Sequence, residues 1–170
     1  GGLEAVENDI RKINRLIITA CGTAYYAVLV GEYMLEEYGG IPVEAEYASE
    51  LKYKKNNIDK KTALLVVSQS GETADTLGVL REFKRKGLLT LGVVNAVGSS
   101  MARETKAGVY NHAGPEIGVA STKAFVSQVA VMALLTLFSG RQRDLSLGVG
   151  RKIAEELGNL PDKMRTVLIQ

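Results

Sequence analysis

One stretch of the sequence, from Ala63 to Thr73, changes abruptly from apolar residues to small, hydroxyl-bearing ones. Its first five residues are apolar and end in two valines, which predicts a strand buried on both faces, as in the middle of a parallel sheet. The polar part, Ser68 to Thr73, is followed by apolar residues at helical spacing from Ala74 to Lys86. The stretch therefore predicts a strand, a tight loop and a helix. Ligands of open α/β sheets bind at the carboxyl ends of strands, so this loop is the first candidate for a site.

Strand and helix patterns alternate along the rest of the chain. Further strands are predicted at residues 16–20, 43–47, 88–94 and 107–111, and further helices at residues 24–38 and 121–139. Shorter helical segments are predicted at residues 4–15, 48–53 and 100–106, and the tail shows a helical pattern around 153–157 and a last stretch at 164–169, after Pro161. The alternation predicts a three-layer α/β/α sandwich around a five-stranded parallel sheet with right-handed crossovers.

Composition excludes several classes of protein. The 170 residues are 46% hydrophobic, which fits one globular domain spanning residues 1–170. A net charge of +2 gives no basic stripe for nucleic acid, and we interpret the lysines at 52, 54, 55, 60 and 61 as a solvated connection. One cysteine and no recognisable leader predict a cytoplasmic location. The most apolar stretch, residues 124–138, is interrupted by Ser127 and Gln128 and is shorter than a membrane helix of about 20 residues, so we expect a buried helix or a subunit interface and no membrane partner.

The hydroxyl loop has the composition of a phosphate cradle. Ser68, Ser70 and Thr73 bring three hydroxyls together, with Gln69 beside them and Gly71 to let the backbone approach a ligand closely. A helix cap is the simpler interpretation, but a cap needs only one hydroxyl. The loop contains no lysine, so it is not the P-loop of nucleotide-binding proteins. We therefore expect a small phosphorylated metabolite as ligand.

A second loop, Cys21-Gly22-Thr23, follows the first predicted strand, and Thr23 could cap the next helix. A thiol at a helix start can be a nucleophile, but a nucleophile needs a base, and nothing in the sequence links His112 to Cys21. We favour a structural thiol and a hydrogen-bonded loop histidine over catalytic roles. The sequence also lacks a Gly-x-Ser-x-Gly elbow and metal-ligand spacing. No catalytic residue, metal or cofactor is assigned.

Three separated motifs together carry a family resemblance: residues 21–23, residues 68–76 and residues 116–124. In this order they resemble the first sugar-isomerase (SIS) domain of the glutamine:fructose-6-phosphate aminotransferase family, which makes glucosamine 6-phosphate, and the likeness extends over residues 16–138. The resemblance implies that Ser68, Gln69, Ser70 and Thr73 hold a phosphate and that the loops at 21–24 and 119–121 contact the sugar. The implied substrate-binding residues are Cys21, Gly22, Thr23, Ala24, Ser68, Gln69, Ser70, Thr73, Val119 and Ser121. Relatives commonly carry a hydroxyl residue at the position of Ala24, so this sequence departs from the pattern there.

The resemblance also implies what this chain lacks. Members of that family carry a glutaminase domain and a second SIS domain, which supplies the catalytic base, and the sequence shows no counterpart of either. We therefore expect part of a longer multidomain enzyme that binds fructose 6-phosphate or glucosamine 6-phosphate without isomerising it alone. A homodimer formed through the apolar helix at 121–139 is also expected. The alternatives are a stand-alone regulatory SIS module that senses a phosphosugar, although no helix-turn-helix accompanies it, and a pure assembly module.

Overall fold

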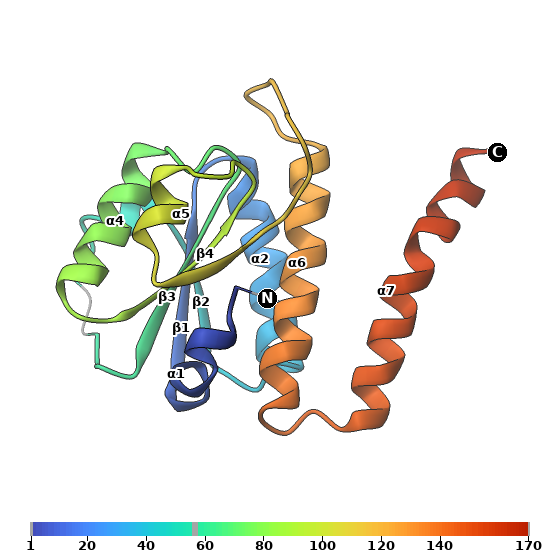
Figure 1. The fold of residues 1–170 in the computed structure, drawn as a ribbon, viewed down its shortest axis with the longest axis horizontal. Coiled ribbons are helices and arrows are strands. Elements are labelled where there is room, and N and C mark those ends of the chain that lie inside the picture. The colour runs from blue at the N-terminus through green and yellow to red at the C-terminus, as the bar shows by residue number, and fades with distance from the viewer. Residues whose placement is uncertain (1, 56–57, 170) are drawn as a thin grey trace.

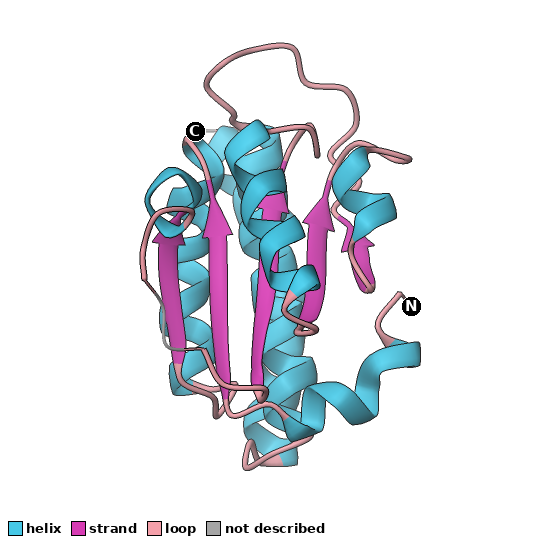
Figure 2. Cartoon of the chain, turned by 90° about the vertical axis from the view of Figure 1, so that its left-hand side faces the viewer, coloured by secondary structure: helices cyan, strands magenta, loops and turns pink. Residues whose placement is uncertain are grey.

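The fold was taken from a computed structural model, which describes residues 2–55 and 58–169; within these residues five parallel strands form one sheet (Figure 1). The strands are β1 (Arg15–Ala20), β2 (Val43–Tyr47), β3 (Thr62–Ser68), β4 (Leu89–Val94) and β5 (Ala107–Tyr110), in the spatial order β2-β1-β3-β4-β5. Figure 2 shows the strands pointing the same way between helices. The predicted three-layer α/β/α sandwich is thereby confirmed.

The central strand, β3, is buried along its whole length, as its apolar run predicts. Alternate residues serve two hydrophobic clusters: Ala63, Leu65 and Val67 belong to one, and Leu64 and Val66 to the other. Because successive side chains of a strand point to opposite faces, the sheet has a core on each side. A covering layer of helices is therefore needed on both faces.

The helices divide between these two faces. One core includes residues of the short 3-10 helix η1 (Glu4–Val6), α1 (Glu7–Lys12), α2 (Thr23–Glu37) and α6 (Lys123–Arg141). The other includes residues of α3 (Ala48–Leu51), α4 (Ala74–Arg85) and α5 (Ser100–Glu104). The segment expected to be helical over residues 4–15 ends earlier, at Lys12, because Arg15 already pairs with Thr62 in the sheet.

Helix α6 lies along α2, and the two helices approach closely at Gly31. A Cβ atom at Gly31 would lie 2.8 Å from Cγ of Met132, so glycine is required for this contact. Of the described helices, α6 alone is long and apolar enough to cross a membrane by length and composition. Ala124, Gln128, Met132 and Thr136, which follow one another at intervals of four residues, are buried against the rest of the fold, as expected of a core helix.

The tail forms one continuous helix, α7 (Leu147–Leu168), where the sequence suggested two separate segments around Pro161. The Oγ of Ser146 caps its first turn by accepting a hydrogen bond from the Val149 N–H at 3.3 Å. Pro161 lacks an N–H and so removes one backbone hydrogen bond from the helix. Among the described residues of α7 only Gly150 is buried, so water can reach the carbonyl that Pro161 leaves unpaired.

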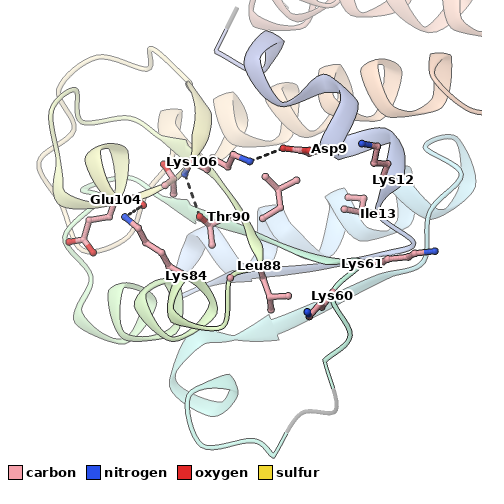
Figure 3. A pocket seen from close by; sticks show the side chains of 13 residues that line it. Asp9, Lys12, Ile13, Lys60, Lys61, Lys84, Leu88, Thr90, Glu104 and Lys106 are labelled. Carbon is pink, nitrogen blue, oxygen red and sulfur yellow. Dashed lines mark hydrogen bonds and ion pairs between the residues drawn. The ribbon is translucent and has the colours of Figure 1, made fainter.

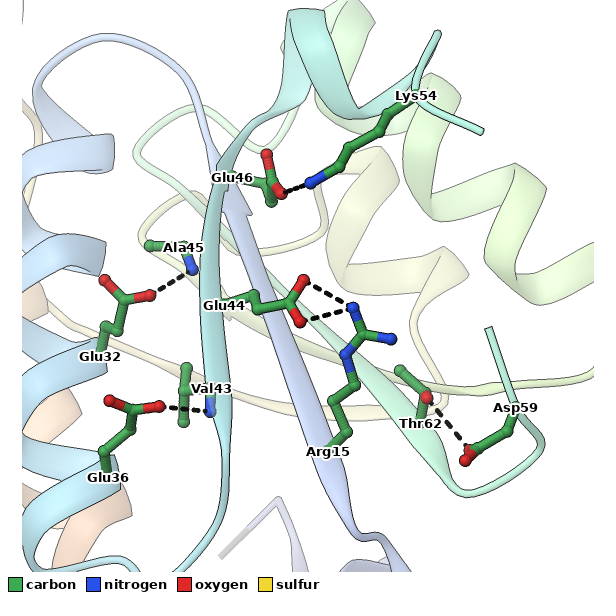
Figure 4. A network of polar contacts seen from close by, with 10 residues as sticks. All are labelled: Arg15, Glu32, Glu36, Val43, Glu44, Ala45, Glu46, Lys54, Asp59 and Thr62. Atoms are coloured by element: carbon green, nitrogen blue, oxygen red, sulfur yellow. Dashed lines mark hydrogen bonds and ion pairs between the residues drawn. The ribbon is translucent and has the colours of Figure 1, made fainter. Parts of the chain in front are cut away.

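Strand β2 is held by carboxylates from α2 (Figure 4). The backbone N–H of Val43 donates to Glu36 Oε1 at 3.1 Å, and that of Ala45 donates to Glu32 Oε1 at 2.8 Å. On the other side of the strand Arg15 pairs with Glu44 at 2.5 Å. These contacts fix the outer strand to both its neighbouring helix and its neighbouring strand.

Candidate functional site

A cavity of about 230 Å³ lies at the carboxyl ends of β1 and β3. Its walls come from the β1–α2 loop and the start of α2, from the end of β3 and the β3–α4 loop, and from α6 and the segment before it. The lining residues are Cys21, Gly22, Thr23, Ala24, Val67, Ser68, Gln69, Ser70, Thr73, Val119, Ser121 and Gln128. Parallel strands open their carboxyl ends to ligands, so the cavity occupies the position where an α/β sheet ordinarily binds one.

The β3–α4 loop is folded by its own hydroxyl groups. Ser68 Oγ accepts a hydrogen bond from the Gly71 N–H at 2.9 Å and lies 3.5 Å from Thr73 Oγ1. Ser70 Oγ accepts from the Glu72 N–H at 3.2 Å. Gly71 has φ of 68°, a left-handed conformation that glycine adopts without strain. Within the described chain, the Thr73 side chain caps no backbone group of α4, so capping does not explain this hydroxyl.

The β4–α5 connection and the first turn of α5 hold this loop in place through hydrogen bonds. The backbone N–H of Ala96 donates to the Gln69 carbonyl at 3.1 Å, and the N–H of Met101 donates to the Gly71 carbonyl at 3.0 Å. The carboxylate of Glu72 accepts from the Ser100 N–H at 2.7 Å, and this hydrogen bond lowers the pKa of Glu72. Glu72 therefore fixes the loop to the start of α5.

Thr23 connects two walls of the cavity. The sequence suggested that its hydroxyl caps α2, but Gly22 occupies the capping position, with φ of 59°, and Thr23 is the first residue of the helix. Its Oγ1 instead accepts a hydrogen bond from the Ser121 N–H at 3.3 Å. The expected cap is therefore wrong, because the hydroxyl has a partner from a distant part of the chain.

Glu116 organises the segment that carries Val119 and Ser121. Its carboxylate accepts from Ser121 Oγ at 2.6 Å and from the N–H of Thr122 at 2.9 Å, Lys123 at 3.1 Å and Ala124 at 3.3 Å. These hydrogen bonds, led by that from Ser121, lower the pKa of Glu116 to about 2. The carboxylate thus caps α6, whose first N–H groups would otherwise lack partners.

The described lining of the cavity carries no residue charged at neutral pH, and the Glu116 carboxylate behind Ser121 is paired with the Ser121 hydroxyl and with backbone N–H groups. The helices α2 and α4 both begin at its wall, with Thr23 and Ala74 as their first residues. Helix N-termini carry partial positive charge and unpaired N–H groups, which favour an anion. With the loop hydroxyls, they could hold a phosphate by several neutral donors. Among the described residues no group of three or more His, Cys, Asp or Glu could hold a metal ion.

The structure brings together all ten residues that the sequence proposed for substrate binding. It adds Val67, which ends the apolar run of β3, and Gln128, from the second turn of α6. The sequence carries a signal for Gln128, which is a polar residue within an apolar helix, but the sequence alone indicates only an interruption of the apolar stretch there.

Cys21 and His112 lie apart. The Cys21 thiol lines the cavity and accepts a hydrogen bond from Thr76 Oγ1 at 3.8 Å. His112 is exposed, with φ of 49°, and its ring packs against Tyr110 outside the described lining of the cavity. The structure therefore offers Cys21 no imidazole base from His112.

A larger cavity, of about 800 Å³, lies at the opposite end of the strands (Figure 3). Its lining includes five exposed lysines: Lys12, Lys60, Lys61, Lys84 and Lys106. Asp9 pairs with Lys106 at 2.7 Å, and the buried hydroxyl of Thr90 accepts from the Lys106 N–H at 3.4 Å. Long exposed lysines are readily solvated. The cavity at the carboxyl ends, with its preformed donors, is the stronger candidate site.

Comparison with known proteins assigns the family. The model of the SIS domain family matches residues 9–138, which include the whole sheet and every residue that lines the candidate site. The chain belongs to the SIS domain family. The matched region ends inside α6, so α7 lies beyond it.

This chain is 45% identical over 170 residues to the glutamine–fructose-6-phosphate aminotransferase (isomerizing) of Chlorobaculum tepidum. The alignment covers 100% of this chain and 28% of that protein. It is 48% identical over 161 residues to the enzyme of the same name from Thermus thermophilus, covering 94% and 27%. The chain thus spans little more than a quarter of the length of these curated relatives. Among solved structures, the C-terminal domain of glucosamine-fructose-6-phosphate aminotransferase from Francisella tularensis superposes with a TM-score of 0.86 at 35% identity, covering 92% of this chain and 44% of that one.

Proposed function

We propose that this SIS domain binds a phosphorylated sugar, with the phosphate on the Ser68–Thr73 loop and the sugar toward Thr23, Val119 and Ser121. The observation that carries the proposal is the cavity itself, where loop hydroxyls and two helix N-termini face one uncharged space. Neutral donors and helix dipoles suit a phosphate monoester. Relatives that match the whole chain are named for fructose 6-phosphate, which supports a sugar as the rest of the ligand.

We further propose that the chain is the first SIS domain of a glutamine:fructose-6-phosphate aminotransferase and binds fructose 6-phosphate or glucosamine 6-phosphate. Its part in the reaction is to bind and orient the substrate, which can contribute greatly to rate. Moving a proton between two sugar carbons needs a base within hydrogen-bond reach. The described lining contains no carboxylate, histidine or lysine, which supports a base supplied from outside this chain. The chain alone therefore binds the sugar phosphate without isomerising it.

Calorimetric titration with fructose 6-phosphate tests the phosphate site. Ser70→Ala removes a hydroxyl from the loop, and a hydrogen bond to a charged group is worth about 1.5–3 kcal/mol. We expect binding to weaken by about 10- to 150-fold, since about 1.4 kcal/mol corresponds to tenfold. Ser146→Ala, which removes the capping hydroxyl of α7, is the matched control and should leave the affinity unchanged. Equal affinity of Ser70→Ala and the unmodified chain would remove the loop assignment.

The second part of the proposal needs a separate assay. Nuclear magnetic resonance of fructose 6-phosphate or glucosamine 6-phosphate incubated with the purified chain should show no interconversion. Turnover by the chain alone would contradict the division between binding here and chemistry elsewhere.

We also propose that two copies associate through α6, whose Val126 and Leu134 are 49% and 57% exposed. Exposed apolar side chains on a core helix are favourable contacts for a second copy. Sedimentation of the chain and of a Val126→Lys, Leu134→Lys double variant tests this, and a concentration-independent monomer would contradict it.

A further inference from the structure

Gln128 combines two properties that are costly together. Its side chain is 1% exposed, and neither its Oε1 nor its Nε2 has a hydrogen-bond partner among the described residues. The residue nevertheless lines the candidate cavity, beside the buried Val67 and Ala24. A buried amide is normally paired, and an unpaired one destabilises the folded state. The described residues of the free protein therefore leave both polar atoms of the Gln128 amide without a hydrogen-bond partner.

The chemistry of the amide indicates what would pair with it. A carboxamide has a donor and an acceptor at the end of one side chain. A phosphate dianion offers acceptors only, and the Ser68–Thr73 loop already presents donors for it. A hydroxyl group both donates and accepts, so it complements both atoms of the amide. The unpaired groups of Gln128 thus correspond to the hydroxyl part of a ligand rather than to its phosphate.

Resting on the function proposed above, we propose that the Gln128 carboxamide binds a hydroxyl group of the sugar while the Ser68–Thr73 loop holds the phosphate. Gln128 already lines the cavity, and its three rotatable side-chain bonds allow the amide to turn into it. Such a change of rotamer costs less than the amide gains by finding a partner. Gln128 is then a specificity residue, and the ligand class is a phosphate ester of a polyhydroxylated chain.

With this role, the Gln128 amide strengthens ligand binding but lowers the stability of the ligand-free protein, and both effects can be measured. Gln128→Met keeps the length and flexibility of the side chain but removes both polar atoms. We expect the affinity for fructose 6-phosphate to fall about tenfold, equivalent to about 1.4 kcal/mol, and the affinity for methyl phosphate, which has no hydroxyl, to stay unchanged. The melting temperature of the ligand-free variant should equal or exceed that of the unmodified chain, because the substitution removes a buried unpaired amide.

Gln142→Met provides the matched control. Gln142 also has an unpaired Nε2 among the described residues, but it follows α6 at the end away from the cavity and its Oε1 accepts from Arg11. This control should not change either affinity. Gln128→Leu is a second variant in case methionine packs poorly, and the same loss of sugar selectivity is expected.

The outcomes separate this inference from the function on which it rests. If the unmodified chain binds neither fructose 6-phosphate nor methyl phosphate, the proposed function and this inference both fall. If it binds both ligands and the Gln128 variants bind them with unchanged selectivity, only the inference is overturned. A lower melting temperature of the free Gln128→Met and Gln128→Leu variants, with both affinities unchanged, would also overturn it by assigning the amide a purely structural role.

Discussion

The hydroxyl of Thr23 accepts a hydrogen bond from the backbone N–H of Ser121, 98 residues later in the chain, at 3.3 Å. This contact joins the start of α2 to the segment that precedes α6. Both residues line the candidate cavity, so this hydrogen bond joins two of its walls directly.

Thr23→Val should loosen this connection. Valine keeps the branched shape of threonine but cannot accept the Ser121 N–H, so the free energy of unfolding should fall by about 0.5–1.5 kcal/mol. Hydrogen exchange at the Ser121 amide should become faster, and urea denaturation gives the stability. Thr23→Ser retains the hydroxyl and should exchange like the unmodified chain. Unchanged protection of Ser121 in Thr23→Val would show that the contact is absent in solution.

Acid should weaken the cap of α6 through Glu116. Its folded-state pKa of about 2 lies below the ordinary value of 4.5, so the ionised carboxylate stabilises the folded state. That contribution is complete above pH 4.5 and is lost as the pH falls through 4.5 toward 2. At pH 7, Glu116→Gln should have a lower melting temperature than the unmodified chain. At pH 2.5, the difference between the two melting temperatures should be smaller. Melting curves at both pH values check this, and a constant difference would contradict the capping role.

Gly71→Ala should damage the loop by two separable effects. Any residue but glycine is strained at φ of 68°, and a Cβ there would lie 2.1 Å from Ser99 Oγ and 2.8 Å from Val94 Cγ1. Gly98 has φ of 73° with open space around the Cβ position, so Gly98→Ala reports the backbone strain alone, about 1–2 kcal/mol. Gly71→Ala should cost about 1–3 kcal/mol more because of the contact. If urea denaturation shows that Gly71→Ala and Gly98→Ala lose the same free energy of unfolding, the loop accommodates the methyl group without an energetic cost.

The thiol of Cys21 should report occupancy of the cavity. It is the chain's single cysteine, so alkylation by iodoacetamide reports one position. Fructose 6-phosphate should slow the reaction by covering Cys21, whereas fructose without a phosphate should not. Equal alkylation rates with and without the sugar phosphate would place the ligand elsewhere.

The elements that the sequence predicted well are those with local signals. The apolar run ending at Val67 and the hydroxyl loop after it belong to one continuous segment, so their order fixes strand, loop and helix together. The carboxyl ends of parallel strands meet at one edge, which explains why residues from three separate motifs line one cavity.

The features that the sequence did not predict depend on contacts between distant segments. Thr23 had the residue type of a helix cap, but its hydroxyl binds Ser121. Pro161 suggested a break, yet α7 continues through it where solvent surrounds the helix. Gln128 was visible as a polar residue among apolar ones, but only the fold shows that its amide is buried and unpaired beside the cavity.

The carboxylates of Glu32 and Glu36 have a consequence for assembly. By accepting the N–H groups of Ala45 and Val43, they occupy donors that another strand would need in order to pair with β2. At the opposite margin Gly2 lies against β5, where a Cβ on it would meet the Gly108 carbonyl at 1.9 Å. Addition of a further strand is thus hindered at β2 by the two carboxylates and crowded at β5 by Gly2. A copy or domain that added a strand beside β2 would first have to displace Glu32 and Glu36.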